Sequence, residues 1–123
     1  MQYLLMIYTS EAEMAAASEA DTTRMTAAYM AYAEAMGQAG VMVGGSRLRP
    51  SSTATTVRSP GGKTQVLDGP YAETKEQLGG YFMIEAPDLD TALSWAERCP
   101  GTALGAVEVR PVWPMTDYAP DRS

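Results

Sequence analysis

Histidine is absent from this chain of 123 residues. Imidazole is the usual general base near neutral pH and the commonest metal ligand in proteins, so Ser-His-Asp, Cys-His and His-metal sites are excluded. Soft ligands are equally scarce, since cysteine occurs only once. We therefore expect any activity to need neither a transition metal nor another cofactor.

The single cysteine is Cys99, which has no second cysteine with which to form an intramolecular disulfide. This usage agrees with a reducing compartment, so we expect a cytoplasmic protein. Cys99 follows a predicted helix, whose dipole disfavours a thiolate at its C-terminal end. We expect an inert thiol rather than a nucleophile.

Basic residues are also few, with nine against fifteen acidic ones and a net charge of -6. That sign opposes binding to a phosphate backbone, so nucleic acid is not an expected direct partner. The apolar stretch MQYLLMIYTS lacks a basic flank and is too short for a signal sequence or a membrane span. We expect neither secretion nor membrane insertion.

Hydrophobic residues make up 46% of the chain, which is enough to build one core at this length. No second independent core fits into so short a sequence. We therefore expect a single domain over residues 1–113 and a C-terminal tail over residues 114–123.

The first predicted strand is apolar at every position. Because side chains alternate along a strand, it presents two apolar faces, and both need a cover. The two alternating sets are Tyr3, Leu5 and Ile7, and Leu4, Met6 and Tyr8. A strand of this kind predicts a sheet that is covered on both sides.

Apolar spacing predicts a helix from Ser18 to Gly40, capped by Ser18 or Asp21, and a second helix that starts after Asp88 and ends before Pro100. A helical turn over residues 11–17 precedes the first helix. Alternation and turn signals predict the other strands. These cover Val41 to Leu48, Gly80 to Ala86 and Ala106 to Val112, with a hairpin formed by Thr53 to Arg58 and Lys63 to Leu67.

This order predicts an α+β fold of the ferredoxin-like βαββαβ type with an inserted β-hairpin. Its antiparallel sheet would have helices on one face only. Since the first strand is apolar on both faces, we expect the open face to pack on a second copy in a homodimer. The alternative is a monomer whose hairpin folds over the open face.

The densest chemistry lies in the segment DGPYAETKEQLGG, which starts at Asp68. Pro70 makes the turn after the preceding strand rigid. The ammonium of Lys75 would lie among the carboxylates of Asp68, Glu73 and Glu76, which can separate their proton affinities. Asp68 is thus a candidate base and Lys75 its electrostatic partner. The alternative is that Asp68 caps the turn and Lys75 forms solvated ion pairs.

A second constellation lies on the sheet, where Glu108 and Arg110 share the face opposite Val107 and Val109. Arg47 could reach the same space and hold an anionic group. An ion pair that fixes the register of strands or subunits explains the charges equally well. The candidate ligand-binding residues are Arg47, Tyr71, Glu73, Tyr81, Glu108 and Arg110.

The chain resembles the DGPF subgroup of the YCII-related family. The resemblance rests on the Asp68–Tyr71 turn, with Tyr71 where the subgroup usually has phenylalanine, and on the following Glu-Lys-Glu run and glycine pair. The segments YLLMIY, VGGSRLRP and VEVRPV agree as well. The resemblance implies a ferredoxin-like fold that dimerises through its sheets as a dimeric α/β barrel.

The resemblance does not imply a known reaction. Wider YCII relatives are suspected enzymes because of a histidine and aspartate pair, and one branch is linked to dechlorination, but this chain has no histidine. DGPF members are often encoded beside extracytoplasmic-function sigma factors, which implies a possible sigma-factor association. Three functions stay open: a cofactor-free enzyme or binder of a small, anionic molecule between the sheet and the DGPY loop, a regulatory partner, and a ligand sensor.

Overall fold

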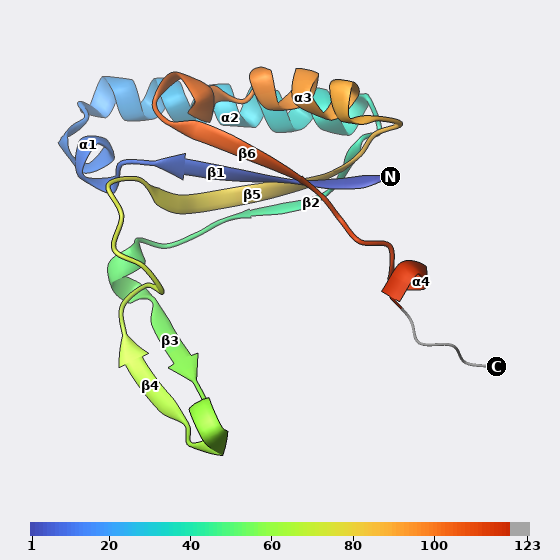
Figure 1. Cartoon of the computed structure of the whole chain (residues 1–123). Helices are drawn as coiled ribbons and strands as arrows, with labels where there is room; N and C mark the ends of the chain where they lie inside the picture. The colour runs from blue at the N-terminus through green and yellow to red at the C-terminus, as the bar shows by residue number, and fades with distance from the viewer. Residues whose placement is uncertain (119–123) are drawn as a thin grey trace.

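The computed structural model describes residues 1–118, which build a four-stranded antiparallel sheet in the order β2-β5-β1-β6. The strands are β1 (Gln2–Thr9), β2 (Met42–Arg47), β5 (Gln77–Glu85) and β6 (Ala106–Pro111). The helices α2 (Glu19–Gln38) and α3 (Leu89–Glu97) both lie on one face of this sheet (Figure 1). The predicted ferredoxin-like α+β fold is confirmed.

The helices begin where the capping residues predict. The Ser18 hydroxyl accepts a hydrogen bond from the Asp21 backbone N–H, so Ser18 is the cap of α2 and Asp21 lies in its first turn. Asp88 caps α3 by accepting a 2.8 Å hydrogen bond from the Thr91 backbone N–H. Each cap satisfies a backbone donor that the helix itself leaves unpaired.

The core lies between the sheet and the two helices. One alternating set of β1, which consists of Tyr3, Leu5 and Ile7, is buried against them. Tyr32 of α2 is buried among these side chains and donates a 2.7 Å hydrogen bond to the carbonyl of Trp95 in α3. This bond lets a phenol enter the core without an unpaired hydroxyl and joins the two helices.

The other face of the sheet carries no helix of this layer, and we call it the open face. Leu4, Met6 and Tyr8 point to it and are half-buried, as the alternation predicts. In the register of β1 with β5, Met6 lies opposite Tyr81. The open face is therefore an apolar surface next to solvent.

The inserted hairpin is a sheet of its own, formed by β3 (Thr55–Arg58) and β4 (Gln65–Asp68), and we call it the arm. It leaves the main sheet on the side opposite α2 and α3 (Figure 1). Its strands pair with each other and not with the main sheet. The alternative that the hairpin folds over the open face is therefore wrong.

Polar contacts hold the base of the arm. The carboxylate of Glu11, the first residue of α1 (Glu11–Ala16), accepts hydrogen bonds of 2.8 and 2.9 Å from the backbone N–H and hydroxyl of Ser51. The Glu11 N–H donates to the side chain of Gln77 at 2.9 Å. These bonds tie α1 to the chain entering the arm and to the strand that follows it.

Three strands begin two or more residues away from the predicted start, among them β4, which begins at Gln65 rather than Lys63 after the short 3-10 helix η2 (Pro60–Gly62). β5 begins at Gln77 rather than Gly80, because its register with β1 shifts between Ile7 and Tyr8 and an irregular pair interrupts the alternation. β3 begins at Thr55 because residues 51–53 form the short 3-10 helix η1. The predicted tail includes the turn α4 (Met115–Tyr118), whereas residues 119–123 lie outside the described residues.

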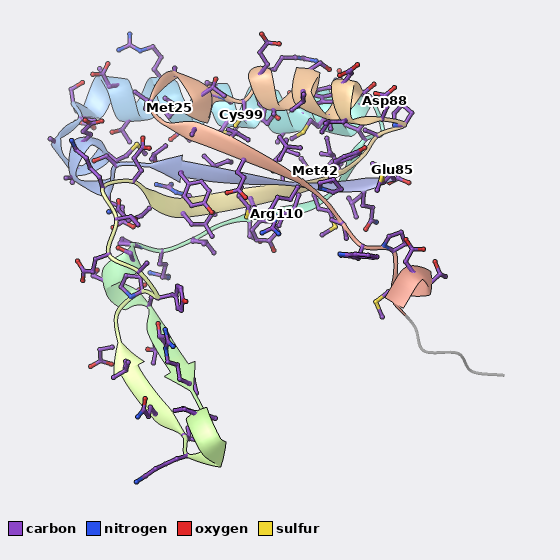
Figure 2. The ribbon with its side chains drawn as sticks, in the orientation of Figure 1. Met25, Met42, Glu85, Asp88, Cys99 and Arg110 are labelled. Atoms are coloured by element: carbon purple, nitrogen blue, oxygen red, sulfur yellow. The ribbon has the colours of Figure 1, made fainter. Side chains whose placement is uncertain are left out.

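Cys99 lies between the helix layer and the sheet, with 2% of its surface exposed (Figure 2). Burial raises the pKa of its thiol, against weaker effects of hydrogen bonds with Gly101 and Tyr29. The expected inert character agrees with this environment.

Cys99 should therefore react with a thiol reagent at least about a hundredfold more slowly in the folded protein than in denaturant, because the sulfur must first be exposed. Stopped-flow absorbance with an aromatic disulfide reagent measures both rates. Equal rates would show that the thiol is open to solvent in the folded state.

Candidate functional site

An open pocket of about 790 Å³ lies at one end of the open face, where β1 and β6 meet α1 and the segment before β5. Side chains from these separate parts of the chain converge on it. The lining residues are Tyr8, Ser10, Glu13, Thr74, Lys75, Glu76, Leu104, Ala106 and Glu108. The depression is broad and open to solvent rather than an enclosed cavity.

Strand register and a helix cap place one wall of the pocket. Tyr8 lies opposite Ala106, and Glu108 follows on the same side of β6 because strand side chains alternate. The Ser10 hydroxyl accepts a 3.2 Å hydrogen bond from the Glu13 backbone N–H and starts α1. This cap brings Glu13 to the pocket within four residues of the strand end.

The segment from Thr74 to Glu76 forms another wall. The side chain of Gln77 donates a 2.6 Å hydrogen bond to the Thr74 carbonyl, and the Thr74 hydroxyl donates to the Glu76 carbonyl. Gln77 is also the residue that binds α1. The network that holds the base of the arm therefore also positions Lys75 and Glu76.

A close approach at Gly105 completes the pocket. A Cβ atom at this position would lie 2.0 Å from the Tyr8 carbonyl oxygen and 3.1 Å from a carboxylate oxygen of Glu76. Only glycine permits this contact, which brings the start of β6 beside β1.

The pocket holds three carboxylates, on Glu13, Glu76 and Glu108, and one ammonium, on Lys75. Within residues 1–118 the only ion pair among these groups joins Glu108 to Arg110 at 4.0 Å, and both of its side chains are largely exposed. Such a pair is weak. The charged groups are therefore available to donate to, or accept from, a bound molecule.

The structure brings Lys75 and Glu108 together and leaves the other predicted residues outside the lining of the pocket. Arg110 lies beside Glu108 on the side of the sheet away from α2 and α3 (Figure 2). Tyr81 lies on the open face opposite Met6. Glu73 is exposed in the segment that leads from the arm to the pocket.

Asp68 ends β4 on the arm and is exposed. Its carboxylate has no hydrogen-bond or ion-pair partner in residues 1–118, so the turn-cap interpretation is wrong. The turn is held instead by the Gly69 N–H, which donates to Ala54 at 2.7 Å, and by the Thr56 hydroxyl, which donates to the Gly69 carbonyl at 2.8 Å. Tyr71 is 78% exposed. The structure does not bring Asp68 to Lys75 in the pocket.

Arg47 does not reach the space of Glu108 and Arg110. Arg47 ends β2 and pairs with Gly80 of β5. β2 forms one edge of the sheet, and β6 forms the other. This register puts Arg47 on the helix side, where its charge lowers the pKa of Tyr29 against the larger effects of burial and Cys99, which raise it. The expectation that Arg47 joins the charges on β6 is wrong, because the strand order separates them.

Comparison with known proteins agrees with this architecture. The model of the YCII-related domain matches residues 1–116. The chain belongs to the YCII-related family. A curated relative from Rhizobium meliloti (strain 1021), an uncharacterised protein, is 36% identical over 114 residues, which cover 91% of this chain and 92% of the relative.

A solved structure shares the fold at 18% identity and a TM-score of 0.57, with 92% of this chain and 94% of the other covered. It is the 5-chloro-2-hydroxyhydroquinone dehydrochlorinase of Burkholderia phenoliruptrix AC1100, in complex with 2,5-dihydroxybenzoquinone. This similarity shows the YCII-related fold. Membership of the DGPF subgroup stays a prediction.

Within the described residues, no group of three or more cysteine, aspartate or glutamate side chains is arranged to hold a metal ion. None of the helices in residues 1–118 is long and apolar enough to cross a membrane.

Several lining residues of this YCII-related pocket were missed from the sequence. Tyr8 belongs to the outward-facing set of the first strand, and Ser10 carries a helix-cap signal before Glu13. Those local signals indicate strand faces and helix starts, but not that the two meet the segment before β5. Only the register at Thr9 and Gln77 joins them.

Proposed function

We propose that this YCII-related protein binds a small hydroxylated ring compound in the pocket between β1, β6 and the segment after the DGPY turn. The observation that carries the proposal is the convergence of Lys75 with Glu76 and Glu108 in an open pocket of about 790 Å³. Carboxylates accept hydrogen bonds from hydroxyl groups, and an ammonium binds an oxygen anion. A hydroxylated ring offers both partners.

The same groups can carry acid–base chemistry without a cofactor. Glu76 or Glu108 accepts the proton of a ring hydroxyl, and Lys75 stabilises the oxygen anion that forms. The dehydrochlorinase with the related fold, whose printed ligand is a dihydroxybenzoquinone, supports this choice of ligand class.

Hydroquinone is a suitable probe because it is uncharged at neutral pH and has two hydroxyl donors. Lys75→Gln and Glu108→Gln should each weaken its binding about fivefold to tenfold, since each removes a charged hydrogen-bond partner. Isothermal titration calorimetry at neutral pH gives the dissociation constants. Glu97→Gln, on the exposed side of α3, is the matched control and should bind like the wild type.

We also propose that the protein is a homodimer that packs through its open face. On this face Val43 is 52% exposed and Leu78 is 37% exposed, next to the half-buried side chains of β1. A second copy would remove this apolar surface from water. The two proposals are tested separately, because calorimetry measures hydroquinone binding and the mass in solution measures the dimer.

A further inference from the structure

The arm has an apolar side that its own chain leaves exposed. Val57 and Val66 lie directly opposite each other in the register of β3 and β4, and they are 60% and 63% exposed. A lone two-stranded hairpin is marginal in water and gains stability when an apolar side is packed. The main sheet of the same copy does not pair with the arm.

The arm also carries cations that have no carboxylate partner. Arg58 lies over the ring of Tyr71 at 5.1 Å and forms no ion pair in residues 1–118, and the same holds for Lys63 near the tip. The pocket carries unpaired negative charge, since the side chains of Glu13 and Glu76 lack cation partners in the described residues. Within one copy, the cations of the arm form no ion pair with the carboxylates of the pocket.

The direction of the arm would let it meet the pocket of a second copy. The arm projects on the side of the open face (Figure 1). From Ala54 to Ser59 one side of the arm has six residues before the 3-10 turn at its tip, which span about 17 Å as extended chain, whereas packed sheets lie about 10 Å apart. The arm is therefore long enough to pass the partner's sheet.

The position of the pocket fits the same arrangement. The arm joins the sheet after β2 and before β5, and the pocket lies at the same end of the sheet beside β1 and β6. A two-fold axis that runs along the strands places the β2 edge of one copy over the β6 edge of its partner. The arm of each copy then runs beside the pocket of the other.

We propose that in the homodimer the arm of each copy covers the pocket of its partner and places Arg58 and Lys63 against Glu13 and Glu76. Arg110 already pairs with Glu108, so the two arm cations match the two pocket carboxylates that lack a cation partner in the described residues. Covering excludes water and strengthens the charged contacts in the pocket. The contact between copies rests on the proposed homodimer, and its meaning for ligand binding rests on the proposed ligand site.

A charge exchange between two full-length variants tests the contact. One variant carries Arg58→Glu and Lys63→Glu on the arm, and the other carries Glu13→Lys and Glu76→Lys at the pocket. Each variant alone places like charges together, so its dimer dissociation constant should rise at least tenfold. In a mixture both contacts of the heterodimer are again between opposite charges, and dimers should return.

Sedimentation velocity at micromolar concentration measures the masses, and circular dichroism checks that each variant is folded. Replacement of residues 55–68 by two glycines gives a second variant, because the hydrogen bond between Gly69 and Ala54 already closes the base of the arm. It should also weaken the dimer at least tenfold. Dimers that withstand both changes, a mixture that stays monomeric, or a monomeric wild type would overturn the proposal. None of these results would decide whether Lys75 and Glu108 bind hydroquinone, which the Lys75→Gln and Glu108→Gln variants test separately.

Discussion

Gly105→Ala should lower the free energy of unfolding by about 3 kcal/mol or more, because a methyl group has no space at this position. The added Cβ would lie 2.0 Å from the Tyr8 carbonyl oxygen, so the backbone of β6 must move away from β1. That movement stretches the strand pairing from Tyr8 to Ala106 and opens one wall of the pocket. Urea unfolding followed by circular dichroism measures the loss.

The matched control is Gly44→Ala, because no heavy atom lies within 4 Å of a Cβ at Gly44 and its φ is not positive. We expect a change of less than about 1 kcal/mol there. A similar slope of free energy against urea in both variants would show that the difference lies in the folded state. Equal stability of the two variants would contradict the close approach at Gly105.

Met6→Glu should raise the dissociation constant of the proposed dimer at least a hundredfold. Met6 lies in the middle of the open face, opposite Tyr81 on one side and Glu108 on the other. A carboxylate at this position must lose its bound water when the two open faces pack. It also lies beside the carboxylate of Glu108, which repels it. Together these effects should cost several kcal/mol of the free energy of association. Light scattering over a concentration series gives the mass.

Met30→Glu is the control for this change. Met30 is 69% exposed on α2, in the helix layer on the other side of the sheet. Met30→Glu alters charge and apolar area as Met6→Glu does. It should leave the dimer intact, because Met30 lies away from the open face. A dimer that persists in Met6→Glu and dissociates in Met30→Glu would assign the interface to the helix layer instead.

Most of the fold could be predicted from strand alternation and helix-capping residues, which are signals between near neighbours in the sequence. The alternation of Leu4 and Leu5 separates the open face from the core without any knowledge of the partner strands, because each strand residue turns its side chain away from the last. Ser18 and Asp88 start the helices because a side-chain oxygen satisfies the free backbone donors at those ends. Such effects act over three or four residues and can be read from a sequence.

The candidate site was predicted less well. Lys75 and Glu108 were both selected, but for two separate sites, and the structure shows one pocket that contains them. Asp68 is a candidate from the sequence because it ends a strand before the rigid turn at Pro70 and precedes Lys75 by seven residues, yet it lies on the arm and outside the pocket lining. Proximity along the chain does not give proximity in space where a strand ends and the chain turns.

The sequence by itself determined the order of the main strands and helices, the two alternating sets of side chains on β1, and the residues that can cap the helices. Only the tertiary structure decided that Arg47 and Arg110 lie at opposite edges, that the hairpin projects as an arm, and which side chains form the pocket. The reason is physical: caps and alternation depend on bonds between near neighbours, whereas strand order and the convergence of Tyr8, Lys75 and Glu108 depend on long-range pairing of β1 with β5 and β6.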